Sequence, residues 1–157
     1  MPGNITTSAF PTRDTTRQAS GLAGERDDGS VNRDEVLTRY ASYLAMCNRH
    51  DWARLTPFLA DTIVVNGRPT SRAEYADDLR ALVAVFPDYR WQLQRALVEG
   101  DWLAVRLHDT GTRVAEFLGA PGDGSAVETT EFAMYHFDTN GLITHVEVTA
   151  DDARLAR

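Results

Sequence analysis

The chain contains one cysteine, Cys47, in 157 residues, and it contains no long apolar run. A single cysteine has no partner for an intrachain disulfide and no second thiol for a metal site, so we expect a reducing compartment, the cytoplasm. A membrane helix requires about 18 or more apolar residues, so we expect no membrane contact. Residues 1–31 also lack the continuous apolar stretch of a secretory signal.

Positive charge is scarce as well. The sequence has 16 Lys and Arg residues against 23 Asp and Glu residues, a formal net charge of −7, and the basic residues are scattered. No basic patch suggests a nucleic-acid surface, so we do not expect nucleic acid as a partner. The motifs GxxxxGKS/T, GxGxxG, HExxH and paired CxxC are missing, and no two histidines stand four residues apart. The sequence therefore predicts no metal site.

The composition indicates one folded domain between two tails. A chain of 157 residues with 43% hydrophobic content is long enough for one core. Residues 1–31 are rich in Ser, Thr, Gly and Pro and have few regularly spaced apolar residues, so we expect a flexible N-terminal tail. The domain is expected over residues 32–152, followed by a short C-terminal tail at 153–157.

Apolar residues at helical spacing predict three helices in the first half of the domain. Asn32 is a candidate cap for the first, with Glu35 three residues later. Ser71 and Glu74 have the spacing of a capping box for the third, which ends at Pro87. The predicted helices cover about 33–49, 51–59 and 71–86.

In the second half of the domain the apolar period changes towards two, which is typical of strands. Gly100-Asp101 and Asn140-Gly141 mark turns, and an earlier β-branched strand ends at Asn66-Gly67. Helices first and successive antiparallel strands afterwards predict an α+β fold, with the helices covering one face of a curved sheet. The predicted strands cover about 62–66, 89–98, 102–112, 126–138 and 142–149.

The alternation along 102–112 predicts which polar side chain shares the core face of that strand. Three aliphatic residues occupy every second position, and continuing in phase places Asp109 on the same face. Strands 62–66 and 126–138 carry apolar residues on both faces, so periodicity leaves their orientation open. The aliphatic residues are Leu103, Val105 and Leu107.

A series of short motifs follows in order along the expected domain: Tyr40-Ala41-Ser42-Tyr43, Asn48-Arg49-His50-Asp51-Trp52, Val65-Asn66-Gly67, Phe86-Pro87-Asp88-Tyr89-Arg90-Trp91, Glu99-Gly100-Asp101-Trp102, Thr110-Gly111-Thr112, Phe117-Leu118-Gly119 and Tyr135-x-Phe137. In this order, over about 34–152, the chain resembles the SnoaL-like polyketide cyclases, or ester cyclases, of the nuclear transport factor 2-like superfamily.

The resemblance implies a cone, in which three N-terminal helices pack on a strongly curved antiparallel sheet closed at one end, a cystatin-like arrangement. It implies a homodimer through the outer sheet face, where a partner would cover Phe132 and Met134. Members of the family close a polyketide ring in natural-product biosynthesis by an intramolecular aldol reaction, with an acidic side chain and with no metal or cofactor. The resemblance therefore implies a small hydrophobic substrate.

Carried onto this chain, the resemblance places Val64, Asn66, Glu131 and Tyr135 inward. It also contains a departure, because the acid that the cyclases present from the last strand falls on Val148. The neighbouring Glu147 would face outward, and a histidine that the cyclases carry inward falls on Ala133. The mechanism of the family therefore does not transfer residue by residue, and catalysis here needs a different acid.

Asp109 and Glu131 are the candidate catalytic residues. Burial and the proximity of two carboxyl groups would raise a pKa towards neutrality, which suits a group that takes a proton next to a carbonyl and returns it elsewhere. Structural roles compete: Asp109 could cap the bend at 110–112, Glu131 could pair with Arg113, and the aromatic residues could be plain core. The candidate substrate-binding residues are Asn66, Tyr135, Trp91, Tyr75, Tyr43 and Tyr40.

The sequence thus predicts a cofactor-independent cyclase or isomerase that uses acid/base chemistry on a hydrophobic, carbonyl-bearing, polyketide-like intermediate. One alternative is an epoxide hydrolase or epoxide-opening cyclase on the same fold. Another is a non-catalytic small-molecule binding or dimerisation module, because a fold does not fix function by itself.

Overall fold

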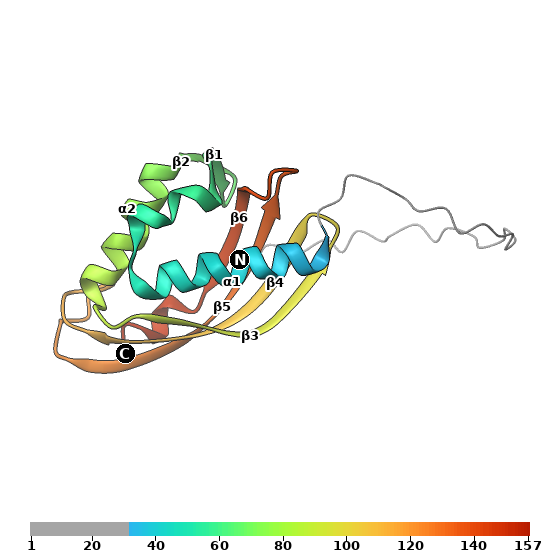
Figure 1. Cartoon of the computed structure of the whole chain (residues 1–157). Coiled ribbons are helices and arrows are strands. Elements are labelled where there is room, and N and C mark those ends of the chain that lie inside the picture. The colour runs from blue at the N-terminus through green and yellow to red at the C-terminus, as the bar shows by residue number, and fades with distance from the viewer. Residues whose placement is uncertain (1–31) are drawn as a thin grey trace, which may run out of the picture.

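The computed structural model describes residues 32–157, and the tail expected over 1–31 lies outside this range. None of the helices in the described residues is long and apolar enough to cross a membrane. Figure 1 shows the helices on one side of a sheet that curls around them. The elements are α1 (Arg33–Arg49), the 3-10 helices η1 (Trp52–Arg54) and η2 (Thr56–Phe58), β1 (Leu59–Val65), β2 (Arg68–Ser71), α2 (Arg72–Val85), β3 (Arg90–Glu99), β4 (Trp102–Arg113), β5 (Ser125–Phe137), β6 (Ile143–Ala150) and the 3-10 helix η3 (Asp152–Arg154).

The two α-helices begin where their capping residues predict. The Asn32 side chain accepts a hydrogen bond from the backbone N–H of Asp34 at 3.0 Å, and α1 follows directly. Ser71 and Glu74 form a complete capping box at the start of α2. The short helix predicted over 51–59 is instead two 3-10 turns, because Pro57 has no backbone N–H to continue an α-helical ladder.

The six strands form one mixed sheet in the order β2-β1-β6-β5-β4-β3. The predicted α+β fold with a curved sheet is confirmed, but a wholly antiparallel sheet is wrong because β1 pairs in parallel with β6. β1 and β6 are far apart in the chain, with α2 and four strands between them, and this long connection allows them to run in the same direction. The four-residue edge strand β2, which contains Pro69, has no alternation from which it could be predicted.

The core lies between the helices and the concave face of the sheet. Along β4 every second residue from Leu103 to Arg113 is buried, and Asp109 lies in phase in this series with 0% exposure. The convex face carries exposed apolar residues, among them Phe132 at 54% and Met134 at 44% exposure. Their predicted position on the outer face is therefore confirmed, while the homodimer through this face stays a prediction.

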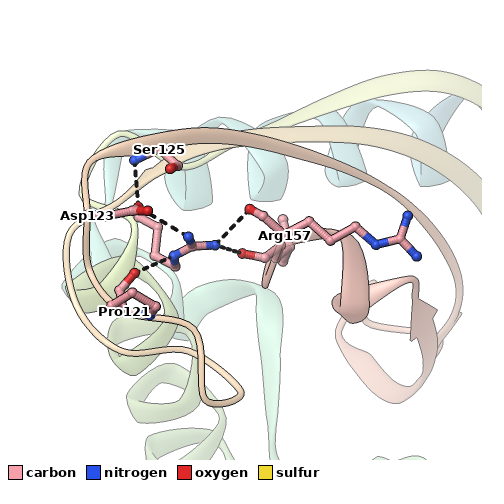
Figure 2. A network of polar contacts seen from close by, with 6 residues as sticks. Pro121, Asp123, Ser125 and Arg157 are labelled. Atoms are coloured by element: carbon pink, nitrogen blue, oxygen red, sulfur yellow. Dashed lines mark hydrogen bonds and ion pairs between the residues drawn. The ribbon is translucent and has the colours of Figure 1, made fainter.

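Residues 153–157, expected as a short C-terminal tail, pack against the domain. Leu155 is buried at 1% exposure, and the buried guanidinium of Arg113 donates to the carbonyls of Leu155 at 2.8 Å and Arg157 at 3.1 Å. The same guanidinium donates to Pro121 O at 2.7 Å and to Asp123 Oδ1 at 3.1 Å (Figure 2). These four contacts fix the C-terminal segment against the loop before β5.

Replacing Arg113 by Met is expected to lower the free energy of unfolding by about 3 kcal/mol, because buried carbonyl oxygens lose their donors. Urea unfolding followed by circular dichroism measures this. Arg106→Met, an exposed arginine on the same strand, should change the free energy by less than about 0.5 kcal/mol. Equal effects of the two substitutions would show that the Arg113 contacts contribute nothing special.

Candidate active site

A cavity of about 240 Å³ lies between α1, α2 and the concave face of the sheet. Its wall is largely aliphatic and aromatic, with two carboxyl groups, so it suits an apolar ligand held by few polar contacts. The lining residues are Tyr43, Leu44, Cys47, Val65, Tyr75, Asp78, Leu79, Leu82, Trp91, Leu107, Glu131, Tyr135, Val146 and Val148.

Glu131 is the carboxyl group that reaches the cavity from the sheet. It lies in the middle of β5, opposite Leu107 on β4 and Ala150 on β6, so strands flank it on both sides. Burial raises the pKa of Glu131 to about 8, and the negative charge of Asp109 is the second cause. At neutral pH the side chain is therefore largely protonated, which makes it a possible proton donor within an apolar wall.

Asp109 lies behind Glu131 rather than on the cavity wall. It pairs with Thr129, two residues before Glu131, so the two carboxyl groups are diagonal neighbours on the concave face. Tyr89 donates a hydrogen bond to Asp109 Oδ2 at 3.4 Å, while Oδ1 has no partner within residues 32–157. Burial raises the pKa of Asp109 to about 7, and the hydrogen bond from Tyr89 opposes that rise.

The two carboxyl groups can therefore share one proton. Glu131 holds it more strongly, because burial and the charge of Asp109 raise its pKa to about 8, against about 7 for Asp109. Paired buried carboxyl groups of this kind do not both ionise near neutral pH, since the second negative charge would lie beside the first in an apolar environment. The arrangement offers a proton donor at the cavity and a proton acceptor directly behind it.

Phenol hydroxyls supply the other polar groups of the wall. Tyr43 and Tyr75 lie on α1 and α2, and their hydroxyls are 2.6 Å apart in a buried hydrogen bond. Tyr135 packs against Tyr43 with ring centroids 5.8 Å apart. Burial raises the pKa of all three hydroxyls above the ordinary value, so they remain protonated donors.

Three predicted binding residues line the cavity with Tyr135, and two do not. Tyr43, Tyr75 and Trp91 form part of the wall, as expected. Tyr40 is core: it is 1% exposed and packs on Tyr135 at 5.0 Å, outside the lining.

Asn66 is the clearest error of the sequence prediction. It is exposed in a left-handed conformation, φ 48°, and its amide side chain bonds the backbone of Val148 at 3.1 and 2.8 Å. The turn at the end of β1 thus uses the whole side chain to attach β1 to β6. The inward face of β1 is also the other one, since Ile63 is buried and Val65 lines the cavity instead of Val64.

The structural alternatives for the two carboxyl groups do not hold. The bend at 110–112 is bound by Asp88, whose carboxylate accepts from the N–H and hydroxyl of Thr112 at 2.6 and 2.7 Å. Asp109 therefore does not cap it. Arg113 does not pair with Glu131, because it bonds Asp123 and backbone carbonyls.

Two residues of the site were missed from the sequence. Asp78 lines the cavity from α2, three residues after Tyr75, and this helical spacing could have revealed it. Tyr89 lies just before β3, where no periodic pattern indicates its contact with Asp109. On β6, Val148 lines the cavity at the position where the resemblance places the acid of the cyclases, and Glu147 is exposed, as predicted.

Residues 32–157 hold no group of three or more His, Cys, Asp or Glu side chains that could bind a metal ion. The site described by this part of the chain is thus one of carboxyl, phenol and apolar groups.

Residues 35–157 match the family model described as SnoaL-like polyketide cyclase. A SnoaL-like polyketide cyclase from Agrobacterium tumefaciens is similar in structure, with a TM-score of 0.70 and 28% identity over 76% of this chain and 94% of that chain. IdmH from Streptomyces antibioticus shares the fold, with a TM-score of 0.69 and 23% identity over 76% and 94% of the two chains. TsrD from Streptomyces laurentii does so with a TM-score of 0.71 and 20% identity over 80% and 94%. No curated protein matches the chain in sequence.

Proposed function

The chain belongs to the SnoaL-like polyketide cyclase family, and from that premise we propose that it is a cofactor-independent cyclase or isomerase. Its substrate in this proposal is an apolar, carbonyl-bearing molecule such as a polyketide-like intermediate. The observation that carries the proposal is a partly buried carboxyl group, Glu131, on the wall of an apolar cavity with a second, fully buried carboxyl group, Asp109, behind it.

In the proposed step, Glu131 passes a proton between substrate and Asp109. One oxygen of Glu131 takes the proton from the carbon next to the substrate carbonyl, while the proton on its other oxygen moves to Asp109. Glu131 stays neutral, Asp109 becomes protonated, and the substrate becomes an enolate. Reversal of the relay returns the proton at a different atom, or the enolate attacks a second carbonyl of the same molecule and closes a ring.

The developing enolate oxygen needs hydrogen-bond donors. The hydroxyls of Tyr43, Tyr75 and Tyr135 lie in or beside the same wall and stay protonated at neutral pH. One donor aimed at a developing oxyanion typically lowers the barrier by about 3 kcal/mol. Because the wall is apolar, water competes little with such a contact.

The proposal is tested by proton exchange on a neutral model ketone. 2-Acetylnaphthalene is incubated with the protein in heavy water, and the loss of its methyl proton signal is followed by NMR. The protein should accelerate exchange above the rate of buffer alone. If it binds the ketone without accelerating exchange, the proposal fails and a non-catalytic binding module is the better description.

Asp109→Asn should change the pH dependence of this exchange as well as its rate. The variant removes the final proton acceptor, and exchange is expected to fall by about 100-fold at pH 7. It also removes the negative charge of Asp109, which is the second cause of the raised pKa of Glu131, so the pKa of Glu131 falls. The pH at which the exchange rate is half its maximum should therefore move to lower pH. Rates measured from pH 5 to pH 9 check both effects. A lower rate with an unshifted midpoint would contradict the proposed coupling.

A further inference from the structure

The cavity wall carries two carboxyl side chains and no basic one among the described residues. Glu131 lies on the sheet, and Asp78 lies on α2 with an exposed side chain, which places it at the rim. Among the described residues, no Arg, Lys or His lines the cavity. An anionic group on a ligand would therefore meet no positive partner and would lie near carboxyl groups.

The basic side chains of α2 do not neutralise Asp78. Arg72 binds Asp61 at 3.0 Å, and Arg80 forms an ion pair with Asp77. Asp78 has no ion pair within residues 32–157. Its negative charge is thus left without a counter-charge beside the opening of an apolar cavity.

Aromatic rings surround the same space. Tyr43, Tyr75, Trp91 and Tyr135 all line the cavity. The faces of such rings attract cations, and the attraction is stronger where water is excluded. A free carboxylate at the rim and aromatic rings within are together the groups that bind a substituted ammonium ion.

We propose that the cavity selects an apolar ligand that carries a protonated amine. The amine lies towards Asp78 at the rim, and the uncharged end lies towards Glu131. This deepens the proposed function and rests on it for the carbonyl at the Glu131 end, whereas the selection for an amine follows from the cavity lining alone.

Three ligands of similar size test the selection by isothermal titration calorimetry at pH 7: 2-naphthylmethylamine as the cation, 2-naphthylmethanol as the neutral ligand and 2-naphthoate as the anion. The amine should bind about tenfold more tightly than the alcohol, and the carboxylate should bind most weakly. Asp78→Asn should reduce the affinity for the amine to that for the alcohol and leave the alcohol unchanged. Glu147→Gln, at an exposed carboxylate outside the cavity lining and without an ion pair among the described residues, is the control and should change none of the three.

The selection is overturned if the alcohol or the carboxylate binds as tightly as the amine, if none of the three binds, or if Asp78→Asn spares the amine. These results are distinguishable from failure of the proposed function, because proton exchange is measured on a neutral ketone. Exchange that proceeds without amine preference would leave the acid/base proposal standing alone. Amine preference without exchange would leave a binding protein for hydrophobic amines.

Discussion

Glu131→Gln is expected to slow proton exchange on 2-acetylnaphthalene by at least about 100-fold, the usual contribution of a positioned acid or base. The amide keeps the shape of the side chain, but it cannot take a proton from the substrate. Asp109 cannot replace it, because this carboxyl group is fully buried behind the cavity wall. Binding of the ketone should change little, so the loss should appear in the rate of exchange at saturating ketone.

Glu128→Gln is the matched control for this variant. Glu128 lies on the same strand, three residues earlier, but it is exposed and contacts His108 and Arg154 on the surface. Exchange by this variant should equal that of the unmodified protein. If Glu131→Gln retains more than about half of the exchange rate, Glu131 is not the group that moves the proton.

The stability of the fold should fall as pH rises from 5 to 9. The pKa of Glu131 is raised to about 8 and that of Asp109 to about 7, so both are protonated in the folded protein over a range where the unfolded chain has already ionised them. The folded state then binds more protons than the unfolded state, and the free energy of unfolding decreases with pH. The contribution of these two protonated carboxyl groups to stability is fully present below about pH 4 and is lost as pH rises to about 8. At about 1.36 kcal/mol per pKa unit, we expect a loss of about 7 kcal/mol between pH 5 and 9, roughly 3 from Asp109 and roughly 4 from Glu131.

Urea unfolding at a series of pH values measures this loss. In the double variant Asp109→Asn/Glu131→Gln neither group ionises, so the curve should be nearly flat from pH 5 to 9, and the variant should be the more stable protein at pH 9. Glu128→Gln should keep the slope of the unmodified protein. A flat curve for the unmodified protein would mean that the two carboxyl groups titrate in the fold as they do in water.

The position of Asp109 was predictable from the sequence, and the position of Glu131 was only partly so. On β4 the aliphatic residues occupy one face alone, so their phase determines the face of Asp109. On β5 both faces are half apolar, because the convex face is itself apolar at Phe132 and Met134. Only the resemblance to a family indicated that Glu131 points inward.

The errors arise where contacts join distant parts of the chain. Asn66 lies in the turn after β1, and its side chain bonds the backbone of Val148, which is 82 residues later in the chain. No local sequence pattern indicates such a contact. The C-terminal residues lack helical or strand periodicity, yet the buried Arg113 donates to their backbone carbonyls. Because every residue has a backbone carbonyl, the residue types do not reveal this contact. The pairing of β1 with β6 is of the same kind.

That pairing also sets an order for how the protein can be made. On the ribosome, the segment Leu59–Val65 is made first, and its parallel neighbour Ile143–Ala150 follows only after β2, α2, β3, β4 and β5. Until β6 is made, β1 can pair only with the four residues of β2, along one edge. Its other edge, which β6 later covers, stays unpaired and apolar. Closing contacts of such high contact order is slow, so this edge is where an incomplete chain would be most open to aggregation and to holding by chaperones.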